Sequence, residues 1–126
     1  MQTILVIDDD ESLRDTIGLM LENEGFRPIL VSDGTTGLEQ AFALRPNLIL
    51  VDLRMPGLSG VEVCKRLRAA SMNTPVIVLS AMGDELDKVL LLEIGRDALH
   101  PIATVRVRRS RERPRTFRVC KQRVRR

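Results

Sequence analysis

The chain has 126 residues, with 20 lysines and arginines against 17 aspartates and glutamates, and a net charge of +3. This length suits one globular domain, and no apolar run approaches the ~18 residues that cross a membrane, so we expect a cytoplasmic protein without a signal peptide. Cys64 and Cys120 are too few for a disulfide framework and lack metal-ligand spacing, so both are expected to be free thiols.

The charge is distributed unevenly along the chain. Residues 106–126 hold eleven of the 20 basic residues and one acid, Glu112, which gives this stretch a net charge of +10, while the first 105 residues carry −7. A stretch with so much charge and so little apolar content cannot offset the entropy lost on ordering. The composition therefore predicts a folded domain over residues 1–105 and a basic, disordered tail over 106–126.

The chain begins with an apolar run, Ile4 to Ile7, of the kind that forms strands buried on both faces. A helix is expected to start at a cap, Asp10 or Ser12, and to end near Gly25. Its inward stripe should consist of Leu13, Ile17, Met20 and Leu21.

The same alternation continues through the middle of the chain. A strand is expected over 27–31, a helix over 34–44 and a strand over 48–52 that ends at Asp52. The second helix should face inward with Leu38, Ala41 and Phe42. Regular alternation of this kind predicts an α/β domain with a right-handed parallel sheet.

A glycine-containing loop over 55–60 precedes a helix over 61–70, a strand over 76–79 that ends at Ser80, and a helix over 84–94. A fifth strand and helix should follow, but the pattern breaks after Gly95. Only Thr104–Arg108 alternates, and it could form a short edge strand. The end of the domain is thus expected to be degraded, with lowered stability.

Acidic residues stand where two of the expected strands end. Asp8, Asp9 and Asp10 follow the first strand, and Asp52 closes the third. Ligands of open parallel sheets bind at the carboxyl ends of the strands. Crowded carboxylates repel one another and call for a cation, and an open all-oxygen site suits Mg²⁺. A metal beside a carboxylate nucleophile is the layout for phosphoryl transfer.

Three motifs occur in order at these strand ends: Leu-Val-Ile-Asp8-Asp9-Asp10, then Val-Asp52-Leu-Arg-Met-Pro-Gly-Leu-Ser-Gly60, then Val-Ile-Val-Leu-Ser80-Ala81. Together they resemble the receiver domain of two-component response regulators, and the match covers residues 2 to about 97. The resemblance implies a flavodoxin-like, doubly wound, five-stranded parallel sheet in the order 2-1-3-4-5. Here the fifth strand and fifth helix are expected to be degraded or absent.

The resemblance also implies a role for each motif residue. Asp52 is similar to the phosphoacceptor, which receives a phosphoryl group from a phosphohistidine of a sensor histidine kinase. Asp9 is similar to the direct Mg²⁺ ligand, Asp8 to the ligand acting through water, and the backbone carbonyl of Arg54 to a third protein ligand.

The last motif carries the expected response. Ser80 is similar to the hydroxyl that hydrogen-bonds the phosphoryl oxygens, and the small Ala81 leaves room for them. By this resemblance the domain is a signalling module, not an enzyme, that changes conformation to regulate an output such as transcription. The domain could form a homodimer, and we do not expect it to bind a membrane.

The resemblance fails after Gly95-Arg96-Asp97, where receivers continue to a Lys-Pro pair. One alignment puts Ile102 and Ala103 at that pair, and another puts His100 and Pro101 there, so neither supplies the lysine. Its loss should weaken phosphorylation or its propagation. Residues from about 96 onward are either a divergent end of a single-domain receiver or a shifted reading frame that replaces a DNA-binding effector domain.

Two other functions are weighed against the signalling reading. A phosphorylation-independent binding module could use the basic tail for weak, salt-dependent nucleic-acid binding, or a helix face for a protein. A hydrolase with Asp52 as nucleophile fits less well, because Arg54 stands where such phosphatases carry a second aspartate.

Overall fold

The computed structural model describes residues 1–81, 103–107 and 119–123. The expected helix over 84–94 and the positions Gly95 to Ile102 lie outside the described residues. The described elements are β1 (Thr3–Ile7), α1 (Glu11–Asn23), β2 (Arg27–Val31), α2 (Gly34–Leu44), β3 (Leu48–Asp52), α3 (Gly60–Ala69), β4 (Val76–Ala81), β5 (Ala103–Val107) and β6 (Val119–Arg123). None of the helices in the described ranges is long and apolar enough to cross a membrane.

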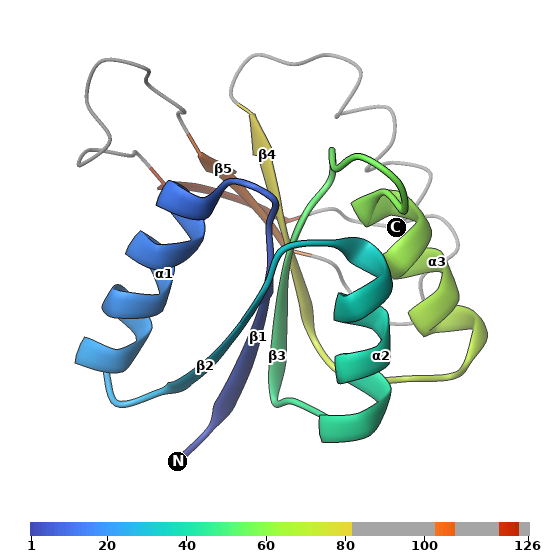
Figure 1. The fold of residues 1–126 in the computed structure, drawn as a ribbon, viewed down its shortest axis with the longest axis horizontal. Helices are drawn as coiled ribbons and strands as arrows, with labels where there is room; N and C mark the ends of the chain where they lie inside the picture. The colour runs from blue at the N-terminus through green and yellow to red at the C-terminus, as the bar shows by residue number, and fades with distance from the viewer. Residues whose placement is uncertain (82–102, 108–118, 124–126) are drawn as a thin grey trace.

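The strands form one sheet in the order β2-β1-β3-β4-β5-β6. Neighbours from β2 to β5 pair in parallel, and β6 pairs antiparallel to β5. Figure 1 shows α1 on one face of the sheet and α2 and α3 on the other. The expected α/β fold is confirmed, with the doubly wound order 2-1-3-4 at its centre.

The C-terminal strands differ from the expectation. β5 covers Ala103–Val107, not Thr104–Arg108, and lies inside the sheet because β6 pairs with its outer side. β5 thus takes the place of the fifth strand next to β4, while the expected loss of the fifth helix falls on residues 108–118, which lie outside the described residues. Within the stretch expected to be a disordered tail, residues 119–123 form β6, which pairs with β5. The division into a domain ending at 105 and a tail stays a prediction.

Both faces of the central strands are buried, as their apolar runs predict. Odd-numbered residues of β1 and β3 face α2 and α3, while even-numbered residues face α1. The first cluster includes Leu5, Ile7, Ile49, Val51 and Leu67, and the second includes Ile4, Val6, Leu13, Ile17 and Leu50. Cys64 of α3 is a free, buried thiol of the first cluster, and burial raises its pKa to about 12.

α1 confirms part of its expected inward stripe. Leu13 and Ile17 are buried and Leu21 packs against their cluster, but Met20 is 48% exposed, so its assignment was wrong. The reason is Gly18, which is buried and lies so close to Leu30 of β2 that an added Cβ would come within 3.0 Å of that side chain. The buried face of α1 therefore contains Leu13, Ile17 and Gly18, and Met20 lies outside it.

α2 shows the same effect. Its bounds agree with the expectation, Ala41 is buried and Leu38 packs partly against the core, but Phe42 is 43% exposed and was wrongly assigned inward. The inward side consists of Gly34, Gly37 and Ala41. These small residues let the helix backbone approach the sheet, and that approach leaves the larger Phe42 at the side.

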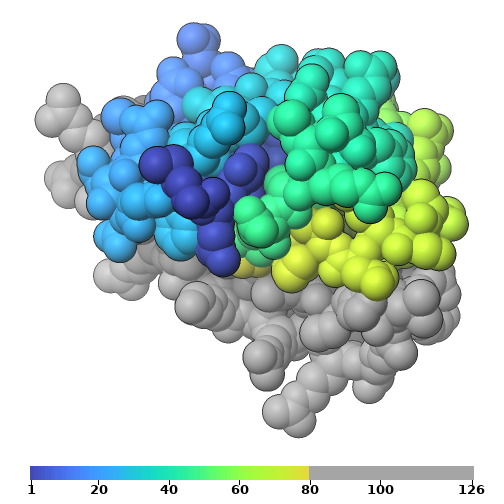
Figure 2. Space-filling view, turned by 90° about the horizontal axis from the view of Figure 1, so that it is seen from below, coloured from blue at the N-terminus to red at the C-terminus, as the bar shows by residue number. Residues whose placement is uncertain are grey.

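Hydrogen bonds join the amino ends of β1, β2 and β3. The amide of Thr3 donates to Asn47 Oδ1 at 2.8 Å, the amide of Asn47 donates to the Thr3 carbonyl at 2.9 Å, and the amide of Arg27 donates to the Gln2 carbonyl at 2.9 Å. Figure 2 shows this end, where the dark blue N-terminal residues lie between light blue and green segments. The aspartates singled out above lie at the opposite, carboxyl end of the strands.

Candidate metal centre

Three aspartates meet at the carboxyl ends of β1 and β3. These strands pair in parallel with Ile7 opposite Val51, so the next residues along them, Asp8 and Asp52, are neighbours. Carboxylate oxygens of Asp8, Asp9 and Asp52 all lie within 4.8 Å of one another. The structure therefore brings together the three side chains that the sequence singled out.

The three carboxylates differ in their exposure to water. Asp8 is fully buried, Asp52 is 4% exposed, and Asp9 is exposed. Buried charges need compensation, because removing a carboxylate from water is costly. Asp9, the exposed member, places one edge of the cluster at the protein surface.

Hydrogen bonds fix the loop that carries Asp8. Asp8 Oδ1 accepts a hydrogen bond from the amide of Asp10 at 2.9 Å, and the amide of Asp8 donates to the Val31 carbonyl at 3.1 Å. Arg14 Nη1 donates to the carbonyl oxygen of Asp8 at 3.0 Å. Asp10 is the N-cap of α1 and accepts from the amide of Leu13 at 3.1 Å. Of the acidic triplet, two members face the cluster and the third starts the helix.

Asp52 is fixed by the turn that follows it. Its Oδ1 accepts a hydrogen bond from the amide of Arg54 at 3.3 Å. The amide of Leu53 donates to the Leu79 carbonyl of β4 at 3.2 Å, and the amide of Gly60 donates to the Leu53 carbonyl at 3.0 Å. The last residue of β3 is thus held between β4 and the first residue of α3.

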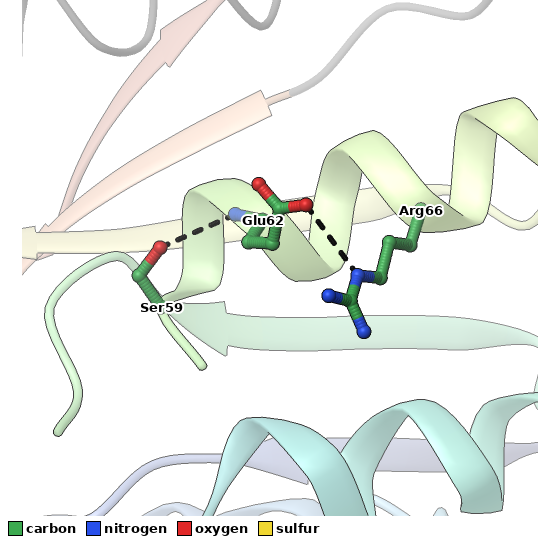
Figure 3. A network of polar contacts seen from close by, with 3 residues as sticks. All are labelled: Ser59, Glu62 and Arg66. Atoms are coloured by element: carbon green, nitrogen blue, oxygen red, sulfur yellow. Dashed lines mark hydrogen bonds and ion pairs between the residues drawn. The ribbon is translucent and has the colours of Figure 1, made fainter. Parts of the chain in front are cut away.

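The start of α3 has its own polar contacts, shown in Figure 3. Ser59 is the N-cap, and its Oγ accepts from the amide of Glu62 at 3.3 Å. One turn later Glu62 pairs with Arg66 at 3.4 Å on the exposed face of the helix. Gly57, with φ +76°, makes the bend in the loop that leads to this cap. The cap fixes where α3 begins, and the pair adds local support within the helix.

The donor set fits a hard divalent cation. All three side chains offer carboxylate oxygens, which Mg²⁺ prefers, and Mg²⁺ held by a few carboxylates usually keeps water or phosphate oxygens as its other ligands. If both carboxyl groups of the buried pair Asp8 and Asp52 are ionised, their charges, no more than 4.8 Å apart, repel by ~3 kcal/mol at an effective dielectric constant of ~20. A divalent cation between them replaces this repulsion by attraction.

The other expected site residues lie on the neighbouring elements. Arg54 is the second residue after β3. β4 pairs Leu79 with Asp52 and continues through Ser80 and Ala81, so both lie beyond the level of Asp52 on the adjacent strand. Their roles toward a phosphoryl group stay predictions.

Sequence reasoning missed two residues that support the cluster. Arg14 lies four residues after Asp10 on α1, which is one helical turn, and its long side chain reaches back to the Asp8 carbonyl. Gly60 was read as a turn residue, but it is the first residue of α3 and lies against the backbone of Asp52. The signal for Gly60 was its position directly after the cap residue Ser59.

Comparison with known proteins agrees with this geometry. Residues 4–99 match the response regulator receiver domain. The chain is 46% identical over 96 residues to the DNA-binding response regulator MtrA of Mycobacterium leprae, and 42% identical over 97 residues to the sensory transduction protein RegX3 of Mycobacterium tuberculosis. These matches cover 76% and 77% of this chain but 42% of each relative, so the chain spans less than half of their length.

Solved structures give the same result. A Francisella response regulator receiver domain matches with a TM-score of 0.70 at 30% identity, covering 82% of this chain and 84% of that one. The N-terminal domain of a response regulator receiver protein from Methanoculleus marisnigri also matches with a TM-score of 0.70 at 30% identity, covering 84% of each chain. The chain therefore belongs to the response regulator receiver family, whose members are signalling modules and not conventional enzymes.

Proposed function

We propose that this domain is the phosphoacceptor of a two-component system, and that Asp52 receives a phosphoryl group from a sensor histidine kinase. The observation that carries the proposal is the convergence of carboxylate oxygens from Asp8, Asp9 and Asp52 within 4.8 Å at the carboxyl edge of the sheet. Membership of the receiver family supports the choice of kinase as partner.

The reaction asks the protein mainly for positioning and charge stabilisation. A carboxylate oxygen of Asp52 attacks phosphorus, the oxygen–phosphorus bond forms, and the phosphorus–nitrogen bond to the kinase imidazole breaks, with the electron pair leaving on nitrogen. Asp8 and Asp9 would hold Mg²⁺ beside the acceptor, and the backbone carbonyl of Arg54 would add a ligand. Mg²⁺ supplies neutralisation of the phosphoryl oxygens when it is bound.

The response to phosphorylation is assigned to β4. Phosphorylation of Asp52 adds negative charge and strong acceptor oxygens beside this strand. The Ser80 hydroxyl donates to them, and the small Ala81 leaves space. A local change of charge then shifts the population between two shapes of the domain surface.

The output proposed for the whole protein is regulation of transcription. The relatives MtrA and RegX3 are more than twice as long as the matched part, and MtrA is named a DNA-binding response regulator. A domain of this kind would regulate a DNA-binding segment joined to it, or act on a separate partner by the same change of surface.

Incubation with acetyl phosphate and Mg²⁺, followed by intact mass measurement, tests the proposal. We expect one added phosphoryl group on the wild type and none on Asp52→Asn, because an amide is not a nucleophile for this transfer. Asp10→Asn is the matched control: it removes the same charge two residues after Asp8, and asparagine still caps α1.

An adduct that persists in Asp52→Asn would remove the assignment of the acceptor. No adduct on the wild type, together with no Mg²⁺ binding, would leave a binding module acting through the basic stretch 106–126 or a helix face as the better account.

A further inference from the structure

The first residue of α3 lies in direct contact with the backbone of Asp52. A Cβ added at Gly60 would lie 2.0 Å from the carbonyl oxygen of Asp52, 2.7 Å from its carbonyl carbon and 2.8 Å from the Cα of Leu53. Real Cβ atoms essentially never approach other heavy atoms closer than 3.0 Å. Any side chain at position 60 therefore displaces the backbone on one side of this contact by about 1 Å or more.

The peptide between Asp52 and Leu53 cannot turn away from such a side chain. A peptide unit is planar, so its carbonyl and its N–H move together. The N–H belongs to Leu53 and donates to the Leu79 carbonyl of β4, while the carbonyl of Leu53 accepts from the amide of Gly60 itself. Rotation of the plane breaks the bond to β4, and α3 is held in the core by Val63, Cys64 and Leu67. Part of the displacement therefore passes to the Cα of Asp52 and hence to its carboxylate.

The other close glycines do not have this relation to the cluster. Among the described glycines, Gly18 and Gly37 have only side-chain atoms as their nearest neighbours, from Leu30 and Ile7. Gly34 meets the carbonyl of Leu58, in the loop before α3. The contact at Gly60 is with the backbone of a residue whose carboxylate belongs to the cluster.

We propose that Gly60 is a positioning residue for Asp52: the bare Cα at the start of α3 is what allows the Asp52 carboxylate to lie within reach of Asp8 and Asp9. This inference rests on the proposed function for its consequence, because a displaced carboxylate loses both metal affinity and alignment for phosphoryl transfer. A misplacement of ~1 Å can cost about 100-fold in the rate of a reaction that depends on positioning.

Gly60→Ala tests the inference, with Val63→Ala as the matched control. Val63 lies on the same helix, is fully buried in the core cluster, and its truncation lowers stability without filling the contact at Asp52. Three quantities are measured for each variant at a temperature well below its thermal midpoint: the ¹³C shift of the Asp52 carboxyl without metal, the Kd for Mg²⁺, and the rate of adduct formation with acetyl phosphate.

We expect Gly60→Ala to move the Asp52 carboxyl shift, to weaken Mg²⁺ binding about tenfold and to slow adduct formation about 10- to 100-fold. Val63→Ala should leave the Asp52 carboxyl shift unchanged and should keep the Kd for Mg²⁺ and the rate of adduct formation within about twofold of the wild type, although its thermal midpoint falls. Equal losses in the two variants, or no change in Gly60→Ala, would overturn the positioning role.

Two further outcomes are also decisive. If the wild type forms no adduct, the proposed function fails, but the metal-free carboxyl shift still decides whether Gly60 positions Asp52. If Gly60→Ala is unfolded, both variants are measured in trimethylamine N-oxide, which strengthens burial. A Gly60→Ala protein that stays unfolded there, while Val63→Ala folds, would show that Gly60 serves the fold and would overturn the inference.

Discussion

The two loops that carry the aspartates are held in different ways. In the loop of residues 8–10, side chains make the contacts: Asp8 accepts from the amide of Asp10, Asp10 caps α1, and Arg14 reaches back to a carbonyl. The loop of residues 53–59 also has side-chain hydrogen bonds, at Asp52 and Ser59. In addition, backbone packs on backbone there, with Gly60 against Asp52 and Gly34 against the Leu58 carbonyl.

The difference has a physical consequence. A side-chain hydrogen bond can be lost for about 1 kcal/mol, and the loop adjusts with water. A backbone contact with no space for a methyl group has no such freedom, because overpacking forces main-chain shifts. We therefore expect the 53–59 loop to be the less tolerant of substitution.

Apart from Gly60→Ala, whose backbone contact is tighter still, the largest effect on stability is expected for Gly34→Ala. The added methyl group would lie 2.3 Å from the carbonyl oxygen of Leu58 and 3.1 Å from its Cβ, so α2 or the 53–59 loop must move. We expect a loss of about 3 kcal/mol in the free energy of unfolding, measured by urea denaturation. Gly18→Ala is the control, since it meets only the flexible end of Leu30; equal losses would break the comparison between the loops.

Arg14→Gln tests the loop held by side chains. The substitution removes the donor to the Asp8 carbonyl, and because Arg14 is only partly buried we expect a loss of about 1 kcal/mol in urea denaturation. Arg66→Gln is the matched control on α3, where an exposed pair with Glu62 contributes about 0.3–0.5 kcal/mol. A loss at Arg14 as large as that of Gly34→Ala would contradict the ranking.

The smallest effect is expected for the pH dependence of stability that Asp33 contributes; Asp33 belongs to neither loop. Asp33 caps α2, and hydrogen bonds from the amide and hydroxyl of Thr36 hold its pKa below the usual value of 3.8. The folded state therefore prefers the ionised carboxylate, so this contribution is present above pH ~4 and is lost as the pH falls through the lowered pKa. Asp33→Asn should flatten the slope of stability against pH below ~4 slightly, while a steeper slope would reverse the assignment.

Much of the fold could be predicted from the apolar runs and helix caps. The predictions of inward-facing helix residues that were wrong have a common cause. The bounds of β2, α2 and β3 agree with the expectation, because strands buried on both faces and capped helices leave clear local patterns. The inward assignments of Met20 and Phe42 failed because glycines and alanines, which carry no strong hydrophobic signal, occupy the faces that approach the sheet most closely.

The remaining differences depend on contacts between distant parts of the chain. β6 exists through its pairing with β5, which periodicity within residues 119–123 does not show. At the cluster, the convergence of Asp8, Asp9 and Asp52 could be predicted, because strand ends of a parallel sheet meet at one edge. The role of Gly60 could not, because it depends on how α3 lies against β3.

Divalent metal binding shows whether Asp8, Asp9 and Asp52 share one ion. Mn²⁺ as a stand-in for Mg²⁺, followed by water proton relaxation, should show one saturable site in the wild type and in Asp10→Asn. Binding should be about tenfold weaker or absent in Asp9→Asn and in Asp52→Asn, because each loses one of the three carboxylate ligands. Equal affinity in all four proteins would show that Asp8, Asp9 and Asp52 do not share an ion, and would contradict the account.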